Sequence, residues 1–256
     1  MTAEKGFSRR DVFKLLGAGS GLVFLHCGPA SALDGKKDSD YDWDKHYWGY
    51  AVDINKCIGC GACMRGCRAE NDVPPGSHRT WVERYRISKD GKVAVDVAKD
   101  GEHVFEPPKA GESISEEKVD NAFFVPKLCN HCEKSVCTQV CPVGASYHTK
   151  DGVVLVDHKQ CVGCGYCIQA CPYGTRYLHP KTHTADKCTL CYHRITKGKM
   201  PACVHSCPTG ARIFGDMKDP KSKINRVLEE HRHRFLKPEL GTNPKCYYLG
   251  LDVEVV

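Results

Sequence analysis

Four blocks of four cysteines account for sixteen of the eighteen cysteines in this chain of 256 residues. The blocks are Cys57, Cys60, Cys63, Cys67; Cys129, Cys132, Cys137, Cys141; Cys161, Cys164, Cys167, Cys171; and Cys188, Cys191, Cys203, Cys207. The first and third blocks have the spacing C-x2-C-x2-C-x3-C, and the last three blocks each end in Cys-Pro. Any fold of this chain must therefore bring many thiols together within a small protein.

The spacing is typical of cysteines that bind cubane iron–sulfur clusters. Two residues between ligands let a tight loop turn its thiolates inward, and the glycines of CIGCGAC and CVGCGYC suit that loop because glycine tolerates positive φ. Backbone amides in such a loop can point at the cluster sulfurs and offset their charge. We therefore predict four [4Fe–4S] clusters and a chain that conducts electrons.

Three other uses of the cysteines compete with this interpretation. Structural zinc sites use four cysteines, but as two separated C-x2-C pairs, so the third cysteine of C-x2-C-x2-C is not needed. A disulfide framework is the usual reading of an even cysteine count in an exported chain. Buried free thiols would show no regular spacing. The spacing favours clusters over all three.

Residues 1–32 resemble a twin-arginine export signal. Residues 8–14 read SRRDVFK, an apolar run follows from Leu15 to Leu25, and Ala30-Ser31-Ala32 offers a cleavage site. The apolar run is shorter than the roughly 20 residues needed to span a bilayer. Because the twin-arginine route carries folded proteins with their cofactors inserted, export does not conflict with cysteine-bound clusters. We expect a peripheral protein on the periplasmic side of the cytoplasmic membrane.

The net charge gives no support to nucleic-acid binding. The whole chain has a formal charge of +6, and residues 1–32 hold four of its 37 basic and two of its 31 acidic residues, which leaves about +4 for the rest. Each cysteine-bound [4Fe–4S]²⁺ core changes the charge by about −2, so four clusters bring the loaded protein to about −4. The sequence also lacks a basic helix or an aromatic-interleaved basic patch. We expect no nucleic-acid partner.

Internal repeats group the blocks into pairs. Residues 52–61 match residues 156–165, and KLCNHC with CPVGA in the second block matches DKCTLC with CPTGA in the fourth. The second and third blocks adjoin, so we predict one contiguous ferredoxin-like unit over 126–182. The first and fourth blocks would form a discontinuous unit over 48–79 and 183–215. The expected fold class is α+β, with two interleaved bacterial-ferredoxin-like two-cluster units, a β-hairpin insertion and a C-terminal helix.

The ferredoxin pattern also predicts which cysteines share a cluster. In two-cluster ferredoxins the fourth cysteine of each run ligates the other cluster. We number the ligand sets by the block that supplies three of their four cysteines. Set 1 is Cys57, Cys60, Cys63, Cys207; set 2 is Cys129, Cys132, Cys137, Cys171; set 3 is Cys161, Cys164, Cys167, Cys141; and set 4 is Cys188, Cys191, Cys203, Cys67. The fourth ligand is exchanged between sets 1 and 4, and between sets 2 and 3.

Residues 80–125 form an insertion between the first and second blocks. Strand-like runs at 81–87 and 92–97 flank Asp90-Gly91, which predicts a β-hairpin. Pro107-Pro108 and the polar residues after it indicate a surface loop.

Residues 216–256 are expected to contain a helix and a closing strand. Apolar positions from Ser222 to Leu236 recur with helical spacing, and Lys245 to Val256 reads as a strand. Cys246 belongs to no block and is expected to be a small packed residue of this strand. His131 and His193 lie beside full cysteine sets, so we expect neither to bind iron.

The sequence resembles the four-cluster iron–sulfur subunits of molybdopterin-family oxidoreductase complexes, the polysulfide, tetrathionate and dimethyl sulfoxide reductases and their nitrite-reductase-associated relatives. The stretches that carry the resemblance are residues 67–76, 79–82, 129–145, 170–180 and 236–249. In this family a basic residue commonly follows the last cysteine of the first block, as Arg68 does here. Some relatives lack one cysteine of the fourth block and hold a three-iron cluster, whereas this chain keeps all four.

The resemblance implies partners for this chain. Such subunits dock against a large molybdopterin-family subunit and a multi-helix quinone-interacting membrane subunit in anaerobic respiratory complexes, and in some assemblies against a multihaem cytochrome c. Qrc-type menaquinone reductase complexes, where electrons flow toward quinone, also use such a subunit. The implied function is a relay of single electrons through four clusters.

We find no nucleophile–base pair, nucleotide-binding glycine loop or paired-carboxylate site in the sequence. The expected role is therefore a non-catalytic electron-transfer subunit of a quinone-linked oxidoreductase. A stand-alone periplasmic polyferredoxin carrier is the alternative, and a zinc-stabilised scaffold is a third class. The insertion and the C-terminal helix disfavour a free carrier, which needs neither.

Overall fold

A computed structural model describes residues 41–98 and 118–251 of this chain. The predicted export signal, the middle of the predicted insertion and the end of the predicted closing strand lie outside these residues. In chain order the elements are η1 (Trp43–Lys45), β1 (Trp48–Asp53), η2 (Ile54–Lys56), α2 (Ala62–Asn71), β2 (Thr80–Ser88), β3 (Val93–Val97), β4 (Val119–Leu128), α3 (Val136–Gln139), β5 (Ser146–His148), β6 (Val154–Val156), α4 (Tyr166–Gln169), β7 (Arg176–Leu178), β8 (Ala185–Lys187), α5 (Tyr192–Ile195), α6 (Ala202–His205), β9 (Arg212–Asp216), α7 (Lys223–Glu230), β10 (His233–Arg234), η4 (Pro238–Leu240) and β11 (Cys246–Leu249).

The strands that flank the cysteine blocks pair in a closed order. The strand after each block pairs antiparallel with the strand before the next block: β2 with β4, β5 with β6, and β7 with β8. The strand after the fourth block, β9, returns to pair antiparallel with β1, which precedes the first block. Each block is therefore anchored at both ends by a strand pair that it shares with its neighbours.

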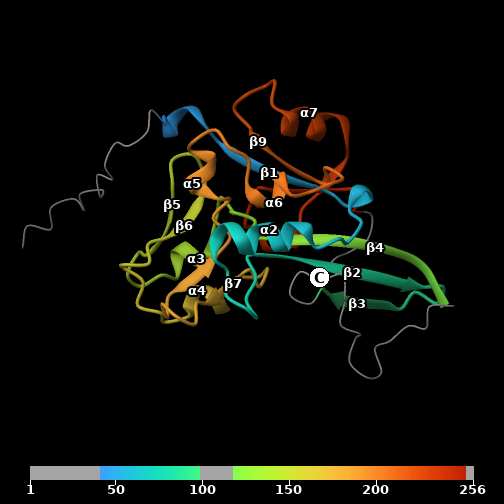
Figure 1. Cartoon of the computed structure of the whole chain (residues 1–256), viewed down its shortest axis with the longest axis horizontal. Helices are drawn as coiled ribbons and strands as arrows, with labels where there is room; N and C mark the ends of the chain where they lie inside the picture. Colours follow the sequence, from blue (N-terminus) through green and yellow to red (C-terminus); the bar gives the residue numbers. More distant parts are fainter. Residues whose placement is uncertain (1–40, 99–117, 252–256) are drawn as a thin grey trace, which may run out of the picture. The chain divides into compact units, whose positions relative to one another are not determined.

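Short helices carry the third cysteine of each block. Helix α2 contacts α6, and α3 contacts α4, so blocks one and four face each other, as do blocks two and three (Figure 1). Helices α3, α4, α5 and α6 have four residues each. Helices of one turn are not stable by themselves, so tertiary contacts and ligands at the cysteines must hold them.

A four-stranded sheet of order β10-β11-β1-β9 pairs β1, the first described strand, with β11, the last described strand. Strand β1 is central, parallel to β11 and antiparallel to β9. Its buried Tyr50 lies opposite Cys246 on one side and Phe214 on the other. These residues belong to the main hydrophobic core, which also contains several block cysteines. The core of the fold is therefore continuous with the sites of sets 1, 2 and 4.

Strands β3, β2 and β4 form a separate antiparallel sheet, drawn side by side in Figure 1. Strands β2 and β3 are joined through the predicted turn at Asp90-Gly91, where Gly91 has a φ of +80°. Strand β4 then extends across the predicted boundary at residue 125 and leads directly into the second block. The insertion is thus attached to the cluster region by a continuous strand.

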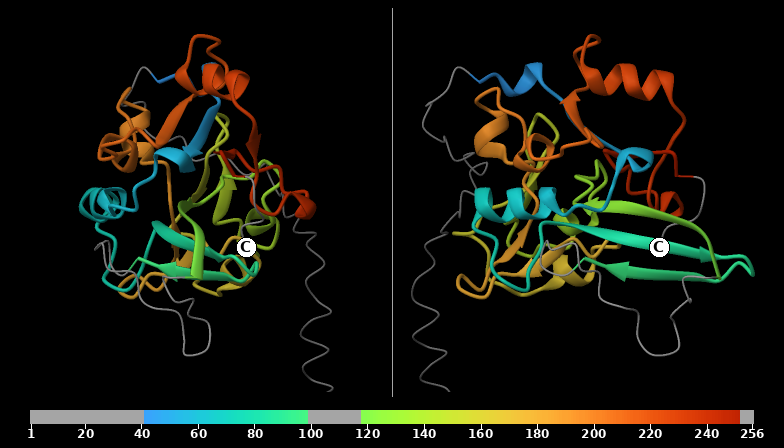
Figure 2. Two further views of the ribbon diagram at one scale, coloured as in Figure 1. Left: turned by 90° about the vertical axis from the view of Figure 1, so that its right-hand side faces the viewer. Right: turned by 45° about the vertical axis from the view of Figure 1, so that its right-hand side comes forward.

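The C-terminal helix is shorter than predicted. Helix α7 ends at Glu230, because His231 is extended and His233–Arg234 pair with β11 as strand β10. The prediction of a helix to Leu236 is therefore wrong beyond Glu230: an edge strand of the sheet takes the residues that would have continued it. Ile224, Val227 and Leu228 belong to the apolar cluster that joins α7 to β1 and β9. The ribbon of α7 is drawn at the top of both views in Figure 2.

The closing strand is also shorter than predicted. Strand β11 covers Cys246–Leu249 and ends at Gly250, which has a φ of +72°. Cys246 is buried within it, as expected. Among the described residues, no helix has both the length and the apolar composition that crossing a membrane requires.

Candidate iron–sulfur cluster sites

All sixteen block cysteines lie in the described part of the chain, and all are free thiols. No two of these cysteines form a disulfide bond, so the competing interpretation of a disulfide framework is not supported. Most are buried or half-buried, and Cys164 alone among the described cysteines is exposed. The thiols thus face the interior, where a bound group would be shielded from water.

The four cysteines of predicted set 2 line one cavity. Cys129, Cys132, Cys137 and Cys171 surround it together with Tyr173 and Arg176. Burial raises the pKa of Cys132 to about 12, and the thiolates of Cys129, Cys137 and Cys171 add to that rise. Cys171 comes from the third block, so the structure brings it to the thiols of the second.

Predicted set 1 shows the same crossing between blocks. Burial raises the pKa of Cys57 to about 11, and the thiolates of Cys63 and Cys207 raise it further. Cys207 belongs to the fourth block and is far from Cys57 in sequence. The pairing of β9 with β1 explains this approach, because it returns the end of the fourth block to the start of the first.

Predicted set 4 completes the exchange between these two blocks. Burial raises the pKa of Cys67 to about 12, and the thiolates of Cys203 and Cys191 add to the rise. Burial also raises the pKa of Cys188, where Cys203 and Cys67 contribute. The last cysteine of the first block therefore lies among the first three of the fourth.

In predicted set 3, the electrostatic neighbours of Cys167 include Cys161 from its own block and Cys141 from the second block. Burial raises the pKa of Cys167, Arg176 opposes the rise, and the thiolates of Cys161 and Cys141 add to it. Cys141 is the last cysteine of the second block. The backbone amide of Ala185 donates to Cys161 Sγ at 3.4 Å, which places a strand amide at this set.

Backbone amides converge on Cys141 and Cys207, two of the three cysteines that precede proline. Burial acts to raise the pKa of Cys141, but hydrogen bonds from the backbone of Ser146, Val143 and Ala145 lower it overall. The pKa of Cys207 is lowered in the same way, against burial, by backbone bonds from Arg212 and its neighbours. These loops stabilise thiolates, the form in which cysteine binds metal.

Glycine is required at two of the cysteine loops. Gly59 and Gly163 have φ values of +71° and +69°. A Cβ at Gly59 would lie 2.5 Å from the Phe124 ring, and one at Gly163 would lie 2.2 Å from the carbonyl oxygen of His183. Both loops are thus packed directly against a neighbouring segment.

The four sets follow one another in the order 1, 4, 2, 3. Cys203 of set 4 acts electrostatically on Cys63 of set 1, and Cys129 of set 2 acts on Cys188 of set 4. The Arg176 guanidinium interacts with Cys137 of set 2 and also with Cys167 of set 3. These interactions link set 1 to set 4, set 4 to set 2, and set 2 to set 3, and we call this order the row 1-4-2-3.

The donor sets fit a cubane cluster. Four inward-facing thiols with amides directed at them are the ligands that such a cluster uses. Within 41–98 and 118–251, no three His, Cys, Asp or Glu side chains are close enough to hold a single metal ion. A core of four irons and four sulfides keeps its thiolates further apart than one ion does.

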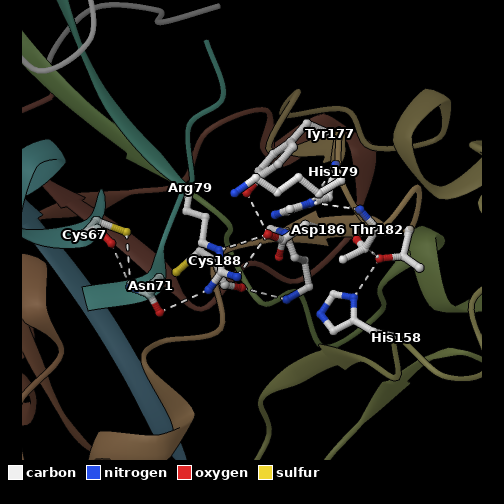
Figure 3. A network of polar contacts seen from close by, with 12 residues as sticks. Cys67, Asn71, Arg79, His158, Tyr177, His179, Thr182, Asp186 and Cys188 are labelled. Atoms are coloured by element: carbon white, nitrogen blue, oxygen red, sulfur yellow. Dashed lines mark hydrogen bonds and ion pairs between the residues drawn. The ribbon is translucent and has the colours of Figure 1, made fainter. Parts of the chain in front are cut away.

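A polar network that the sequence did not reveal begins at set 4 and runs through Asn71 and Arg79 to Asp186 (Figure 3). The amide of Asn71 lies 3.5 Å from the Sγ atoms of both Cys67 and Cys191. Arg79 donates to the Asn71 amide oxygen at 3.0 Å and forms an ion pair with Asp186 at 3.0 Å. The only available signal was the resemblance over residues 67–82, which named no role for Asn71.

The two discounted histidines make contacts outside the cysteine sets. His131 is buried and accepts a hydrogen bond from the backbone of Val154 at 3.0 Å. His193 is exposed and lies 2.7 Å from a carboxylate oxygen of Glu70.

Comparison with known proteins supports the cluster sites. Two family models, each described as a 4Fe-4S dicluster domain, match residues 56–145 and 120–217. The B subunit of tetrathionate reductase from Salmonella typhimurium is 44% identical over 210 residues, covering 81% of this chain and 74% of the relative. The B chain of polysulfide reductase from Wolinella succinogenes is 40% identical over 203 residues (78% and 92%), and the protein NrfC homolog of Haemophilus influenzae is 40% identical over 237 residues (91% and 92%).

Proposed function

Because this protein belongs to the 4Fe-4S iron–sulfur subunit family that includes the B subunit of tetrathionate reductase, we propose that it relays single electrons through four [4Fe–4S] clusters within a respiratory oxidoreductase complex. When bound, each cluster supplies one-electron transfer, and the protein supplies ligands, shielding and order. The observation that carries the proposal is the arrangement of sixteen free thiols as four neighbouring sets in one row.

We assign the ligands as the four predicted sets. The neighbours found for Cys57, Cys67, Cys132 and Cys167 support the exchange of the fourth ligand between blocks. The contacts of α2 with α6 and of α3 with α4 support two interleaved ferredoxin-like units. This arrangement pairs set 1 with set 4, and set 2 with set 3.

The ends of the row are the expected points at which electrons enter and leave. At set 1, Ile58 follows Cys57 and is 57% exposed; at set 3, Val162 follows Cys161 and is 65% exposed. Set 3 also contains the exposed Cys164. Exposed apolar side chains next to a redox centre suit contact with another protein.

The proposed partners follow the names of the relatives. Those names describe one component of a multi-component reductase, so a catalytic partner subunit is part of the proposal. We propose a large molybdopterin-family subunit at one end of the row and a quinone-interacting membrane subunit at the other. The twin-arginine-like residues 8–14 support assembly on the periplasmic side of the membrane.

Anaerobic purification of the full chain from its native host tests this function. We expect a brown protein with about sixteen irons per chain, eluting in gel filtration with a larger subunit. A single species at 28.4 kDa or less would instead support a free polyferredoxin carrier. A colourless protein with bound zinc would overturn the cluster assignment itself.

A further inference from the structure

Three cationic side chains are buried among the cysteine sets without a carboxylate partner. Arg176, Lys187 and Arg212 are 5%, 1% and 3% exposed, and within the described ranges none of them forms an ion pair with Asp or Glu. Removing a charge from water costs several kcal/mol unless another charge compensates it. Their counter-charges must therefore come from elsewhere.

Other buried cations of this chain do have carboxylates. Two such pairs are Arg86 with Asp96 at 3.1 Å and Lys127 with Glu83 at 2.7 Å, and the half-buried Arg79 pairs with Asp186 at 3.0 Å. Lys245, also buried, has Glu133 and Asp151 as its strongest charged neighbours. By contrast, the strongest charged neighbours of Arg176, Lys187 and Arg212 include cysteines and no carboxylate.

Arg176 lies between sets 2 and 3. Its Nη2 is 2.9 Å from Cys137 Sγ and 2.8 Å from Ser146 Oγ, and its buried Nη1 has no hydrogen-bond partner in the described structure. Although burial alone would lower the pKa of Arg176, the thiolates of Cys137, Cys129 and Cys167 raise it. This guanidinium therefore lies beside thiols of both sets, and its Nη1 is available to donate to a group bound there.

Arg212 occupies the equivalent place between sets 1 and 4. It donates to Tyr50 Oη at 3.2 Å and to Thr80 Oγ1 at 2.8 Å, and Tyr50 Oη is itself 3.3 Å from Cys203 Sγ. The thiolates that act most strongly on its guanidinium are Cys63 and Cys203. These cysteines come from α2 and α6, the facing helices of this unit.

The two arginines are related by the internal repeat. Each is the fifth residue after the last cysteine of its block, in CPYGTR and CPTGAR. At the same place after the second block stands Ser146, whose hydroxyl accepts a hydrogen bond from Arg176. Each proposed unit therefore contains one arginine of this kind.

Lys187 lies where the two units meet. It is adjacent to Cys188 of set 4, and its Nζ donates to the carbonyl oxygens of Cys188, at 2.8 Å, and Val154. Burial and the nearby Arg176 lower the pKa of Lys187, and the thiolates of Cys129, Cys188 and Cys137 act against this, so sets 2 and 4 both favour its charged form. The junction between sets 4 and 2 thus also holds one cation.

We propose that Arg212, Lys187 and Arg176 occupy the three junctions of the row 1-4-2-3 and raise the reduction potentials of the two clusters on either side. The inference rests on the proposed function. A [4Fe–4S]²⁺ core held by four thiolates has a net charge of about −2, and reduction adds a further negative charge. A fixed cation in a low-dielectric interior stabilises that added charge on both neighbours.

Redox titration of the purified complex, followed by EPR, tests the proposal with the variants Arg176→Gln, Lys187→Gln and Arg212→Gln. Each is expected to lower two midpoint potentials by at least about 59 mV, a tenfold change in a one-electron equilibrium. Arg176→Gln should affect clusters 2 and 3, Lys187→Gln clusters 4 and 2, and Arg212→Gln clusters 1 and 4. The two arginine variants should therefore have no affected cluster in common. Arg86→Gln is the control, because Arg86 is buried beside Asp96 in the β2–β3 hairpin.

The outcomes separate this inference from the proposed function. Fewer than four clusters in the wild-type protein would contradict the proposed function, which requires four. Four clusters with potentials unchanged by a Gln variant, or shifted equally by the control, would overturn the assignment at that junction. If a Gln variant loses clusters, the charge-retaining variants Arg176→Lys, Lys187→Arg and Arg212→Lys decide. Four clusters with wild-type potentials then support the role of charge, and cluster loss there too assigns the residue to packing.

Discussion

Asn71 on α2 donates a hydrogen bond to the Sγ of Cys191, which lies 120 residues further along the chain, at 3.5 Å. The same amide nitrogen is 3.5 Å from Cys67 Sγ, and Arg79 holds the amide oxygen at 3.0 Å. The side chain is thus fixed between two predicted ligands of one cluster, contributed by different blocks.

Replacing Asn71 with Leu is expected to lower the potential of cluster 4, because two thiolates lose a donor that disperses the charge of the reduced state. If the hydrogen bonds differ by about 1 kcal/mol between the two oxidation states, the shift is roughly 40 mV. EPR-monitored redox titration measures it. Asn225→Leu is the control, since Asn225 donates to backbone carbonyls beside α7; equal potentials in both variants would contradict the prediction.

A serine substitution at Cys67 or Cys207 should damage the cluster that is held mainly by the other block of the same unit. Cys207→Ser is expected to damage cluster 1 although Cys207 belongs to block four, and Cys67→Ser should damage cluster 4. Loss of one ligand converts a cluster to a three-iron form or removes it, which EPR and iron analysis detect. The double variants Cys57→Ser/Cys207→Ser and Cys188→Ser/Cys67→Ser should each lose one cluster. Loss of two clusters in either double variant would show that each block binds its own.

Gly163→Ala should prevent assembly of cluster 3. The new methyl group would lie 2.2 Å from the His183 carbonyl oxygen, so the loop between Cys161 and Cys164 must move. Gly165→Ala is a matched control: its φ is also positive, +78°, but no atom lies within 4 Å of the added carbon. The control is expected to lose about 1 kcal/mol of stability and to keep four clusters. Equal iron contents in the two variants would refute the steric argument.

Cluster retention should increase with pH. In the metal-free chain, burial raises the pKa of Cys57 to about 11 and those of Cys67 and Cys132 to about 12. Cluster ligation requires thiolates and so lowers these pKa values, which means that the loaded state loses stability as pH falls below about 11. Anaerobic removal of iron by a ferrous chelator, followed by visible absorbance, should be slower at about pH 8 than at about pH 6. A faster loss at the higher pH would reverse the sign of this linkage.

Removal of the clusters should unfold the region of the cysteine sites before the β3-β2-β4 sheet. The four-residue helices α3 to α6 depend on the cysteine sites, whereas β2, β3 and β4 pack Val82, Tyr85 and Val125 and are crossed by the Arg86–Asp96 ion pair. After anaerobic chelation of iron, hydrogen exchange should speed up first in residues 129–210 and later in β2 and β4. Simultaneous loss of protection in both regions would show that the insertion has no stability of its own.

The family could be predicted because it depends on cysteine spacing and repeat order, both visible in the sequence. The end of α7 could not, because the backbone of His233–Arg234 pairs with β11, a partner that helical periodicity does not report. Asn71 was missed because one amide between two distant cysteines leaves no pattern. Arg176 and Arg212 stand at equivalent positions of the sequence repeat, but only the structure shows that neither has a carboxylate partner among the described residues.

The position of β1 between β9 and β11 also sets a schedule for synthesis of the protein. A ribosome adding about 5–20 residues per second needs roughly 10–40 s to pass from β1 to β11. During that interval, β1 has neither neighbour until β9 is made, and it has only one until β11 is made. The second and third blocks are complete well before its end, so half of the molecule can be assembled while the other half waits for the final residues. A premature stop codon near Cys246 would therefore remove a strand that holds β1 and so disturb the first cysteine block, although that block is encoded near the start of the message.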